Sequence, residues 1–251
     1  MQRILSRVRR CVSDYNMIEK DDVIAVGVSG GKDSLTLLCT LARLQSFYPI
    51  PFTLKAISLD MGYNADFSKI TAMCEELGVE YHVVPTNIKQ IVFDIRKEEH
   101  PCSLCARLRR GALNEAAKSF HCNKVALGHH LDDAVETFFM SLFFEGRINC
   151  FAPVTFLDRT GITKIRPMLY VYEKEIIGVA RRYELPVLAS GCPADGYTKR
   201  QEIKELIKNL GVDYRDLKKQ VFSAIQRSEL RGWEATPDTP KRKNGVPPES
   251  E

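Results

Sequence analysis

The sequence predicts an α/β fold built on a parallel β-sheet, because short apolar runs alternate with longer segments of helical periodicity. Four apolar runs have the length and composition of buried strands, and a fifth, weaker run ends just before Pro167. The predicted strands are 23–28, 54–59, 80–84, 123–127 and 164–166. The predicted helices are 33–46, 66–77, 103–119, 132–144 and 173–184. A short apolar segment at 186–188 is expected to form a further strand.

The arrangement of such a sheet predicts where a ligand binds. Parallel crossovers are right-handed, so the loops after successive strands gather at one edge of the sheet. Residues 29–34, Asp60 and residues 128–130 each follow a predicted strand, and we expect them at this edge. Ligands of open α/β sheets bind there.

Composition sets broad limits on the class of protein. The 251 residues are 44% hydrophobic, which is ordinary for a globular protein with a full core. No apolar run approaches the length that crosses a bilayer, and no apolar segment of the signal-peptide type follows the basic residues at the start. We therefore expect a cytoplasmic protein without a membrane partner, whose eight cysteines are reduced thiols, metal ligands or catalytic groups.

The net charge of +4 is unevenly distributed. Residues 199–231 hold nine Lys or Arg against five Asp or Glu, and the first fourteen residues hold four Arg against one Asp. A third basic patch lies at 106–118, with Arg107, Arg109 and Arg110. Together the patches predict a polyanionic partner such as RNA. For any single patch, a solvated helix face is the more ordinary interpretation.

The string Ser29-Gly30-Gly31-Lys32-Asp33-Ser34 joins the first predicted strand to a helix. Adjacent glycines allow a tight turn, and the N–H groups of a helix N-terminus favour an anion, so the string predicts a phosphate-binding loop. Its spacing differs from that of a Walker A loop. The alternative is a simple turn with a solvated Lys-Asp pair. The string resembles the PP-loop of the adenine-nucleotide alpha-hydrolase-like family, which implies ATP binding and adenylation of a substrate.

A second polar group follows the fourth predicted strand, in Gly128-His129-His130-Leu131-Asp132-Asp133. Paired carboxylates beside bound phosphates suit Mg²⁺, although acidic residues in a first helical turn are also ordinary caps. The following run, 138–144, is apolar nearly all round and is expected to be core. Asp60 is expected either near the nucleotide or as a turn-forming residue before Gly62.

The cysteines offer a third site. Cys102 and Cys105 form a single CxxC motif that opens a predicted helix, where the helix N-terminus is expected to lower the thiol pKa. The motif alone leaves open a redox dithiol, a zinc site completed from afar, and an iron–sulfur cluster with a third thiolate, for which Cys192 is a candidate. The remaining cysteines are expected to be small core residues: Cys11, Cys39, Cys74, Cys122 and Cys150.

The blocks SGGKDS, CSLCARLRRGAL, LGHHLDDAVETFF and IRPMLYVYEKEI, in this order, closely resemble tRNA 2-thiocytidine synthetases of the TtcA type over about residues 20–225. The resemblance implies a Rossmann-like PP-loop fold, ATP, Mg²⁺ and a [4Fe–4S] cluster on Cys102, Cys105 and Cys192. It implies a nucleotide site at residues 29–34 with Gly128, His129, Asp132 and Asp133. It further implies an ATP-dependent enzyme that thiolates a tRNA cytidine, with a cysteine desulfurase or sulfide as sulfur donor. The oligomeric state stays open, a homodimer being one option.

The chain departs from this family at two places: Ala189 stands where a further cysteine is often found, and the C-terminal region is long and charged. The expected organisation is a basic segment at 1–20, the ATP-binding catalytic domain at 21–197, a basic helical extension at 198–234 and a flexible tail at 235–251. The extension is expected to contain helices at 198–210 and 213–229. The rival functions are a tRNA lysidine synthetase-like ligase, which needs no cysteines, and a non-catalytic nucleotide- or metal-binding sensor.

Overall fold

The six strands of the protein form one sheet in the order β3-β2-β1-β4-β6-β5, in a computed structural model that describes residues 1–96, 101–189, 192 and 199–234. The strands are β1 (Asp22–Gly27), β2 (Phe52–Asp60), β3 (Glu80–Pro85), β4 (Lys124–Ala126), β5 (Val154–Leu157) and β6 (Ile162–Ile165). The helices are α1 (Gln2–Asp14), α2 (Lys32–Gln45), α3 (Ser68–Glu76), α4 (Pro101–Ser119), α5 (Leu131–Glu145), α6 (Glu173–Arg182), α7 (Lys199–Asp213) and α8 (Leu217–Arg227), with a π-helical segment η1 (Gln90–Ile95). The predicted tail at 235–251 lies outside the described residues.

The predicted parallel sheet is confirmed: β3, β2, β1, β4 and β6 run parallel to their neighbours. The edge strand β5 pairs antiparallel with β6, which the sequence interpretation did not include. The expected strand at 186–188 is wrong, since this segment has no strand structure. It instead follows the end of α6 as an irregular loop that packs on the turn after β1.

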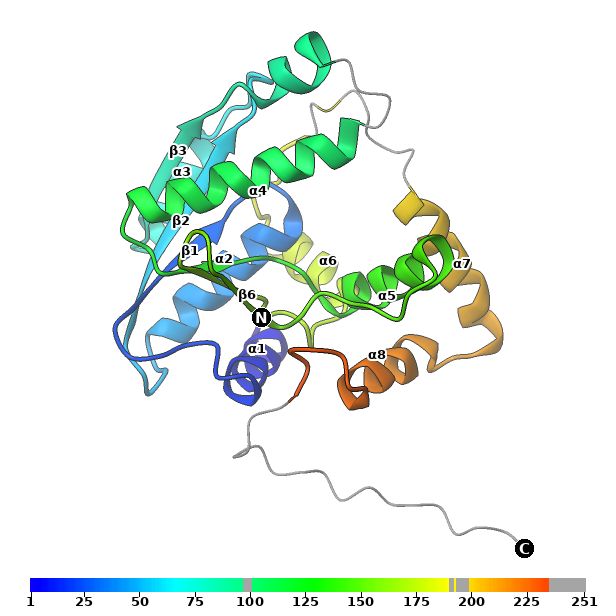
Figure 1. Cartoon of the computed structure of the whole chain (residues 1–251). Coiled ribbons are helices and arrows are strands. Elements are labelled where there is room, and N and C mark those ends of the chain that lie inside the picture. Colours follow the sequence, from blue (N-terminus) through cyan, green and yellow to red (C-terminus); the bar gives the residue numbers. More distant parts are fainter. Residues whose placement is uncertain (97–100, 190–191, 193–198, 235–251) are drawn as a thin grey trace, which may run out of the picture.

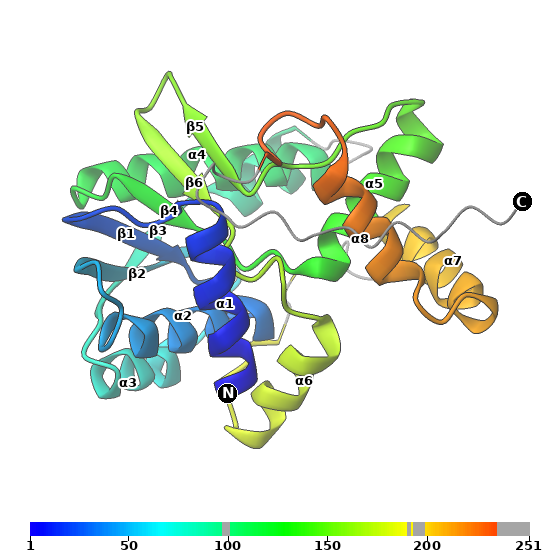
Figure 2. The ribbon, with the colours of Figure 1, turned by 90° about the horizontal axis from the view of Figure 1, so that it is seen from below.

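Helices cover both faces of the sheet (Figures 1 and 2). Figure 2 shows α4 on one face and α1, α2 and α3 on the other. Side chains alternate along a strand, so Ile24 and Val26 of β1 belong to the large core under α2, whereas Ala25 belongs to the smaller core under α4. The two cores fix the sheet between its helices and hold the carboxyl ends of the strands in place.

The N-terminal segment forms helix α1, which contributes Ile4, Val8 and Val12 to the large core. Arg3, Arg9 and Arg10 are exposed, whereas Arg7 is half-buried and pairs with Glu175 of α6. The apolar residues recur at helical spacing, so the hydrophobic effect holds the basic segment against the domain.

Helices α5, α7 and α8 form a second group beside the sheet (Figure 1). The single tryptophan, Trp233, is buried and packs edge-on against Phe222 of α8 and Tyr15.

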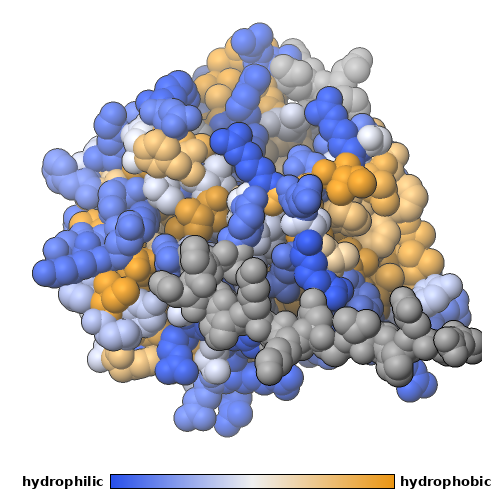
Figure 3. All heavy atoms as spheres, turned by 60° about the horizontal axis from the view of Figure 1, so that its bottom comes forward, coloured by the Kyte–Doolittle hydropathy of each residue, from blue (hydrophilic) through white to orange (hydrophobic). Residues whose placement is uncertain are grey.

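The five cysteines expected in the core are buried, as predicted. The expectation of a buried apolar run at 138–144 is wrong at its end, because Phe143 is 57% exposed. Figure 3 shows a hydrophobic area on its right, the side on which α5 lies in Figure 1.

Candidate active site

The turn after β1 has the geometry of an anion-binding loop. Gly30 has a φ of +80°, a conformation that favours glycine. The Ser34 hydroxyl accepts a hydrogen bond from Ser29 N at 3.1 Å and donates one to the Gly31 carbonyl at 2.9 Å. Gly31 is the N-cap of α2, and no described side chain caps this helix end. The first N–H groups of α2 are therefore directed at the space in front of the loop.

Lys32 is held at the start of α2 by two carboxylates. Its Nζ lies 3.1 Å from Asp33 Oδ1 and 3.1 Å from Glu173 Oε1 of α6. Burial lowers the pKa of Lys32, but the two carboxylates outweigh burial, so its pKa is raised. Burial raises the pKa of Glu173, but hydrogen bonds from Lys204 and Lys32 outweigh it and hold the pKa at about 2. Lys32 is therefore a fixed cation at the loop.

Glu173 was not among the predicted site residues. It lies in the block IRPMLYVYEKEI, which sequence analysis used only for the family resemblance. The long-range contact with Lys32 makes it part of the site, and sequence spacing alone carries no signal of that contact.

The polar segment after β4 approaches the phosphate-binding loop closely. A Cβ atom on Gly128 would lie 3.1 Å from main-chain atoms of Asp33 and Ser34, so a larger residue cannot fit without displacing the loop. His130, the N-cap of α5, accepts a hydrogen bond from Asp133 N, and Asp133 Oδ2 accepts one from His130 N at 2.9 Å. The second predicted group thus lies beside the first, at the same sheet edge.

Asp132 and Asp133, the predicted magnesium ligands, already have partners. Asp132 accepts a hydrogen bond from Glu173 N at 2.7 Å and pairs with Lys218. Asp133 Oδ1 lies 3.2 Å from Arg200, and its other oxygen caps α5. Protein donors thus engage both carboxylates, and Mg²⁺ would have to displace Lys218 or Arg200 to bind them. The magnesium assignment stays a prediction.

The C-terminal helices supply the cations for these acids. Three of the nine basic residues in 199–231 form ion pairs with carboxylates in the first two turns of α5 and the first turn of α6. The pairs are Arg200–Asp133, Arg200–Glu136, Lys204–Glu173 and Lys218–Asp132. Part of the basic excess that sequence analysis assigned to RNA is therefore internal charge compensation that holds α7 and α8 in place.

His129 and Asp60 make structural contacts. Burial, and next the charge of Arg166, lower the pKa of His129 to about 4, so its ring is neutral at pH 7. Arg166 Nε donates to His129 Nδ1 at 3.3 Å. Asp60 Oδ1 accepts a hydrogen bond from Gly62 N at 2.9 Å, which is the turn-forming alternative. A nucleotide contact by either residue stays a prediction.

The three predicted ligand cysteines lie near one another. Cys102 is exposed, and Cys105 and Cys192 are half-buried. Burial raises the pKa of Cys105, Arg109 opposes this, and the nearby Cys192 and Cys102 raise it further. The predicted lowering of this thiol pKa at the helix start is therefore wrong for Cys105, because burial outweighs the helix end and Arg109.

Tyr63, which sequence analysis did not identify, completes this group. Burial raises its pKa to about 12, and the next causes are the charge of Cys192, a hydrogen bond with Cys192 and the charge of Cys105. Tyr63 lies in the loop after β2, and Lys89 lies over its ring at 5.4 Å. Only a tertiary contact brings the loop to the thiols, so the sequence pattern gave no signal of it.

The donor set consists of three neighbouring thiols, a set of the kind that could hold an iron–sulfur cluster. Among the described residues, no group of three or more His, Cys, Asp or Glu converges as ligands of one ion would. A structural zinc ion needs four converging ligands, whereas a cluster distributes its thiolates over several irons. The ligand form of cysteine is the thiolate, which the raised pKa of Cys105 disfavours. Binding to a metal ion removes the thiol proton and would overcome this effect.

A short segment connects the thiols with the phosphate-binding loop. Leu188 N donates to the Gly30 carbonyl at 2.9 Å, and a Cβ atom on Gly30 would lie 2.8 Å from the Leu188 side chain. Cys192 follows four residues later, a span of at most about 14 Å of extended chain. The two sites therefore belong to one region.

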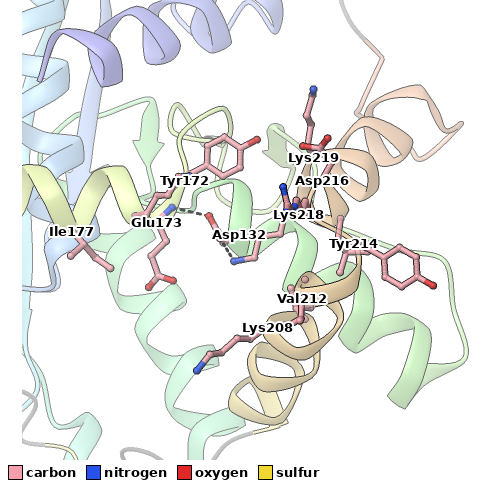
Figure 4. Close-up of a pocket in the computed structure, with 15 residues that line it drawn as sticks. Asp132, Tyr172, Glu173, Ile177, Lys208, Val212, Tyr214, Asp216, Lys218 and Lys219 are labelled. Carbon is pink, nitrogen blue, oxygen red and sulfur yellow. Dashed lines mark hydrogen bonds and ion pairs between the residues drawn. The ribbon is translucent and has the colours of Figure 1, made fainter.

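A pocket of about 520 Å³ lies beside this region, between α6 and the helices α7 and α8 (Figure 4). Asp132 lies between Lys218 and the main-chain nitrogen of Glu173, as the dashed lines in Figure 4 mark. Because Glu173 also contacts Lys32, the pocket borders the phosphate-binding loop.

A family model described as a PP-loop domain matches residues 2–210. The chain belongs to the PP-loop family. This PP-loop protein is 40% identical over 235 residues to the tRNA-cytidine(32) 2-sulfurtransferase of Geotalea uraniireducens, covering 91% of this chain and 92% of the relative. It is 41% identical over 234 residues to the protein of that name from Geobacter metallireducens, covering 92% and 91%. The resemblance to tRNA 2-thiocytidine synthetases is confirmed.

A solved structure supports the fold assignment of this PP-loop protein. The U34-tRNA thiolase NcsA from Methanococcus maripaludis, determined with its [4Fe–4S] cluster, aligns with a TM-score of 0.71 at 26% identity. The alignment covers 90% of this chain and 77% of that thiolase. The predicted PP-loop fold with a mostly parallel sheet is confirmed. In the part of the chain that the structure describes, no helix is both long and apolar enough to cross a membrane.

Proposed function

We propose that this protein is an ATP-dependent tRNA sulfurtransferase that adenylates the C2 oxygen of a cytidine and replaces that oxygen with sulfur. The observation that carries the proposal is the single region formed by the phosphate-binding loop and three gathered thiols, joined through Leu188. The names of the relatives support sulfur transfer to a tRNA cytidine, and the name of the thiolase supports thiolation of a tRNA base.

Activation is the first task, because the oxygen at C2 is a poor leaving group. Attack of that oxygen on the α-phosphate of ATP forms an O–P bond and releases pyrophosphate. Lys32 and the N–H groups at the start of α2 would stabilise the negative charge that develops on the leaving pyrophosphate. Lys32 must exchange its contact with Glu173 for a phosphate contact, so nucleotide binding would loosen this ion pair.

Sulfur addition is the second task. A sulfide equivalent forms the C–S bond at C2, the C–O bond breaks, and the base oxygen leaves on AMP. Cys102, Cys105 and Cys192 would hold a [4Fe–4S] cluster, which would supply a place for the sulfur that is transferred. Tyr63, beside Cys192 and Cys105, would help to exclude water from the activated base.

The proposal includes a cytoplasmic enzyme with tRNA as substrate and a cysteine desulfurase or free sulfide as sulfur donor. The exposed basic residues that lack internal partners are the candidates for phosphate contacts. Arg215 and Lys219 at α8 are examples, in contrast to Lys218, which pairs with Asp132.

The test separates the two half-reactions. Protein prepared without oxygen is incubated with ATP, sulfide and an unmodified tRNA transcript, and pyrophosphate release and sulfur incorporation are measured separately. Cys192→Ser should keep tRNA-dependent pyrophosphate release and lose both iron and sulfur incorporation. The control, Cys39→Ser, changes a thiol in α2 and should keep both activities. A Cys192→Ser protein that still incorporates sulfur would contradict the assignment.

A further inference from the structure

A second pocket, of about 530 Å³, lies between α4 and the β5–β6 hairpin, away from the thiols. Figure 2 shows this hairpin beside α4 at the edge of the sheet. The pocket residues that matter here are Arg107, Arg110, Asn114, Phe156, Arg159 and Lys164. We propose that this pocket binds a nucleotide of the tRNA other than the modified base, a proposal that rests on the tRNA sulfurtransferase function.

The lysine in this pocket is buried and has no counterion. Lys164, on β6, is only 8% exposed, and its ammonium group forms no hydrogen bond or ion pair with any described residue, although its main chain pairs with β4 and β5. Burial, followed by the charges of Arg166 and Arg110, lowers its pKa. The stem of Lys164 is thus buried, and its ammonium group lies near two further cations without an anionic partner among the described residues. An anionic ligand that enters the pocket would supply the missing partner.

A second buried polar group in the pocket also lacks a partner. Asn114, on α4, is 8% exposed, and its Oδ1 accepts no hydrogen bond from the described residues. Buried polar groups are normally satisfied, and an exception requires an explanation. The amide oxygen of Asn114 would accept from a ligand N–H or O–H group, such as a ribose hydroxyl or a base amino group.

The charge of the pocket favours a phosphate. Arg107, Arg110 and Arg159 surround Lys164, and none of the three forms an ion pair among the described residues. Asp158 is the one acidic residue of the pocket lining. Four cations against one carboxylate leave a strongly positive pocket, and the salt bridges that neutralise α7 and α8 have no counterpart here.

An aromatic side chain favours a nucleotide over a simple anion. Phe156, on the edge strand β5, is 60% exposed although it lines the pocket. Exposed aromatic rings beside cations are the common means of binding unpaired RNA bases by stacking. The pocket therefore combines a phosphate site, a polar acceptor and a stacking platform.

The position of the pocket shows that its ligand is not the base that is modified. A helix turns by about 100° per residue, so Arg107, Arg110 and Asn114 lie on the side of α4 opposite Cys105. RNA held in the pocket would thus reach the thiols only around the end of α4. The pocket should set the affinity for tRNA and leave the chemical steps unchanged.

The test measures binding of an unmodified tRNA transcript by fluorescence anisotropy over a range of salt concentrations. Lys164→Met should weaken binding about fivefold or more and reduce the salt slope by about 1. Phe156→Leu should weaken binding to a similar extent without changing the slope. The controls are Lys118→Gln, an exposed cation on the same helix, and Phe47→Leu, an exposed ring behind α2, which should match the unaltered protein.

Two further readouts make the outcome decisive. Lys164→Met should unfold at a urea concentration no lower than that of the unaltered protein, because Met fills the space of the buried lysine stem and removes the repulsion from Arg166 and Arg110, so weak binding cannot be attributed to misfolding. In thiolation assays, Lys164→Met should raise KM for tRNA and leave kcat unchanged. If the unaltered protein thiolates tRNA but Lys164→Met binds it with the same affinity and salt slope, the pocket proposal is wrong. If the unaltered protein does not bind tRNA, the proposed function itself fails.

Discussion

The ion pairs of Glu173 with Lys204 and Lys32 allow a quantitative test of the site. In Glu173→Gln the side chain keeps its size and loses its charge. The pKa of about 2, against an ordinary value of 4.5, corresponds to about 3 kcal/mol at about 1.4 kcal/mol per pH unit. The carboxylate is 20% exposed, so solvent screening makes this an upper bound. Glu173→Gln should therefore lose up to about 3 kcal/mol of unfolding free energy at pH 7.

The stability difference between the unaltered protein and Glu173→Gln should depend on pH in a defined direction. A carboxyl whose pKa is lowered by folding stabilises the fold above its unfolded pKa, here about 4.5, and loses this effect as the pH falls toward 2. By the same linkage relation, the difference between the unaltered protein and Glu173→Gln should shrink to about 2 kcal/mol at pH 3.5. The free energies are measured by urea unfolding, followed by the fluorescence of the buried Trp233.

A matched variant defines the baseline. Glu202→Gln removes an exposed pair with Lys199, whose side chains are 58% and 65% exposed, and should cost less than about 0.5 kcal/mol at either pH. If Glu173→Gln destabilised the protein no more than Glu202→Gln, or by the same amount at pH 7 and pH 3.5, the account of Glu173 as the ionised partner of Lys204 and Lys32 would be refuted.

Three further changes test other parts of the site. Lys32→Ala should abolish tRNA-dependent pyrophosphate release, and unchanged release would remove the phosphate role of this lysine. Gly128→Ala places a methyl group 3.1 Å from the main chain of Ser34, so it should weaken ATP binding about tenfold, as measured by calorimetry, whereas retained affinity would show that the loop can move freely. Arg200→Gln leaves the buried Glu136 with only a distant lysine and should cost about 2 kcal/mol or more in urea unfolding, whereas Arg215→Gln, at an exposed position, should cost little.

Much of the fold could be predicted because buried parallel strands are nearly continuous apolar runs, as in β1. The hairpin of β5 and β6 could not be predicted in this way. Strand β5 is a four-residue edge strand of mixed exposure, and the local sequence feature that indicates the hairpin is the turn at Gly161. The end of α5 also misled the prediction. Its aromatic residues imply burial, but Phe143 and Phe144 are 57% and 47% exposed, and the sequence does not encode where packing stops.

The site was predictable where its chemistry is local. The phosphate-binding loop and the capping of α5 by Asp133 follow from neighbouring residues. The role of Glu173 and the pairing of Arg200 depend on contacts between distant helices, so basic residues that appeared free for RNA proved to neutralise buried acids. The thiol of Cys105 was expected to have a lowered pKa, and burial, which a motif does not reveal, reversed the direction.

The central claim is that this protein thiolates a tRNA cytidine after adenylating it. The most direct measurement is mass spectrometry of nucleosides from an unmodified tRNA transcript, after incubation with oxygen-free protein, ATP, sulfide and lysine. The account predicts 2-thiocytidine that forms only with ATP and is accompanied by equal amounts of AMP and pyrophosphate. A lysine adduct of cytidine, or tRNA left unmodified by protein that retains its iron and binds ATP, would contradict it.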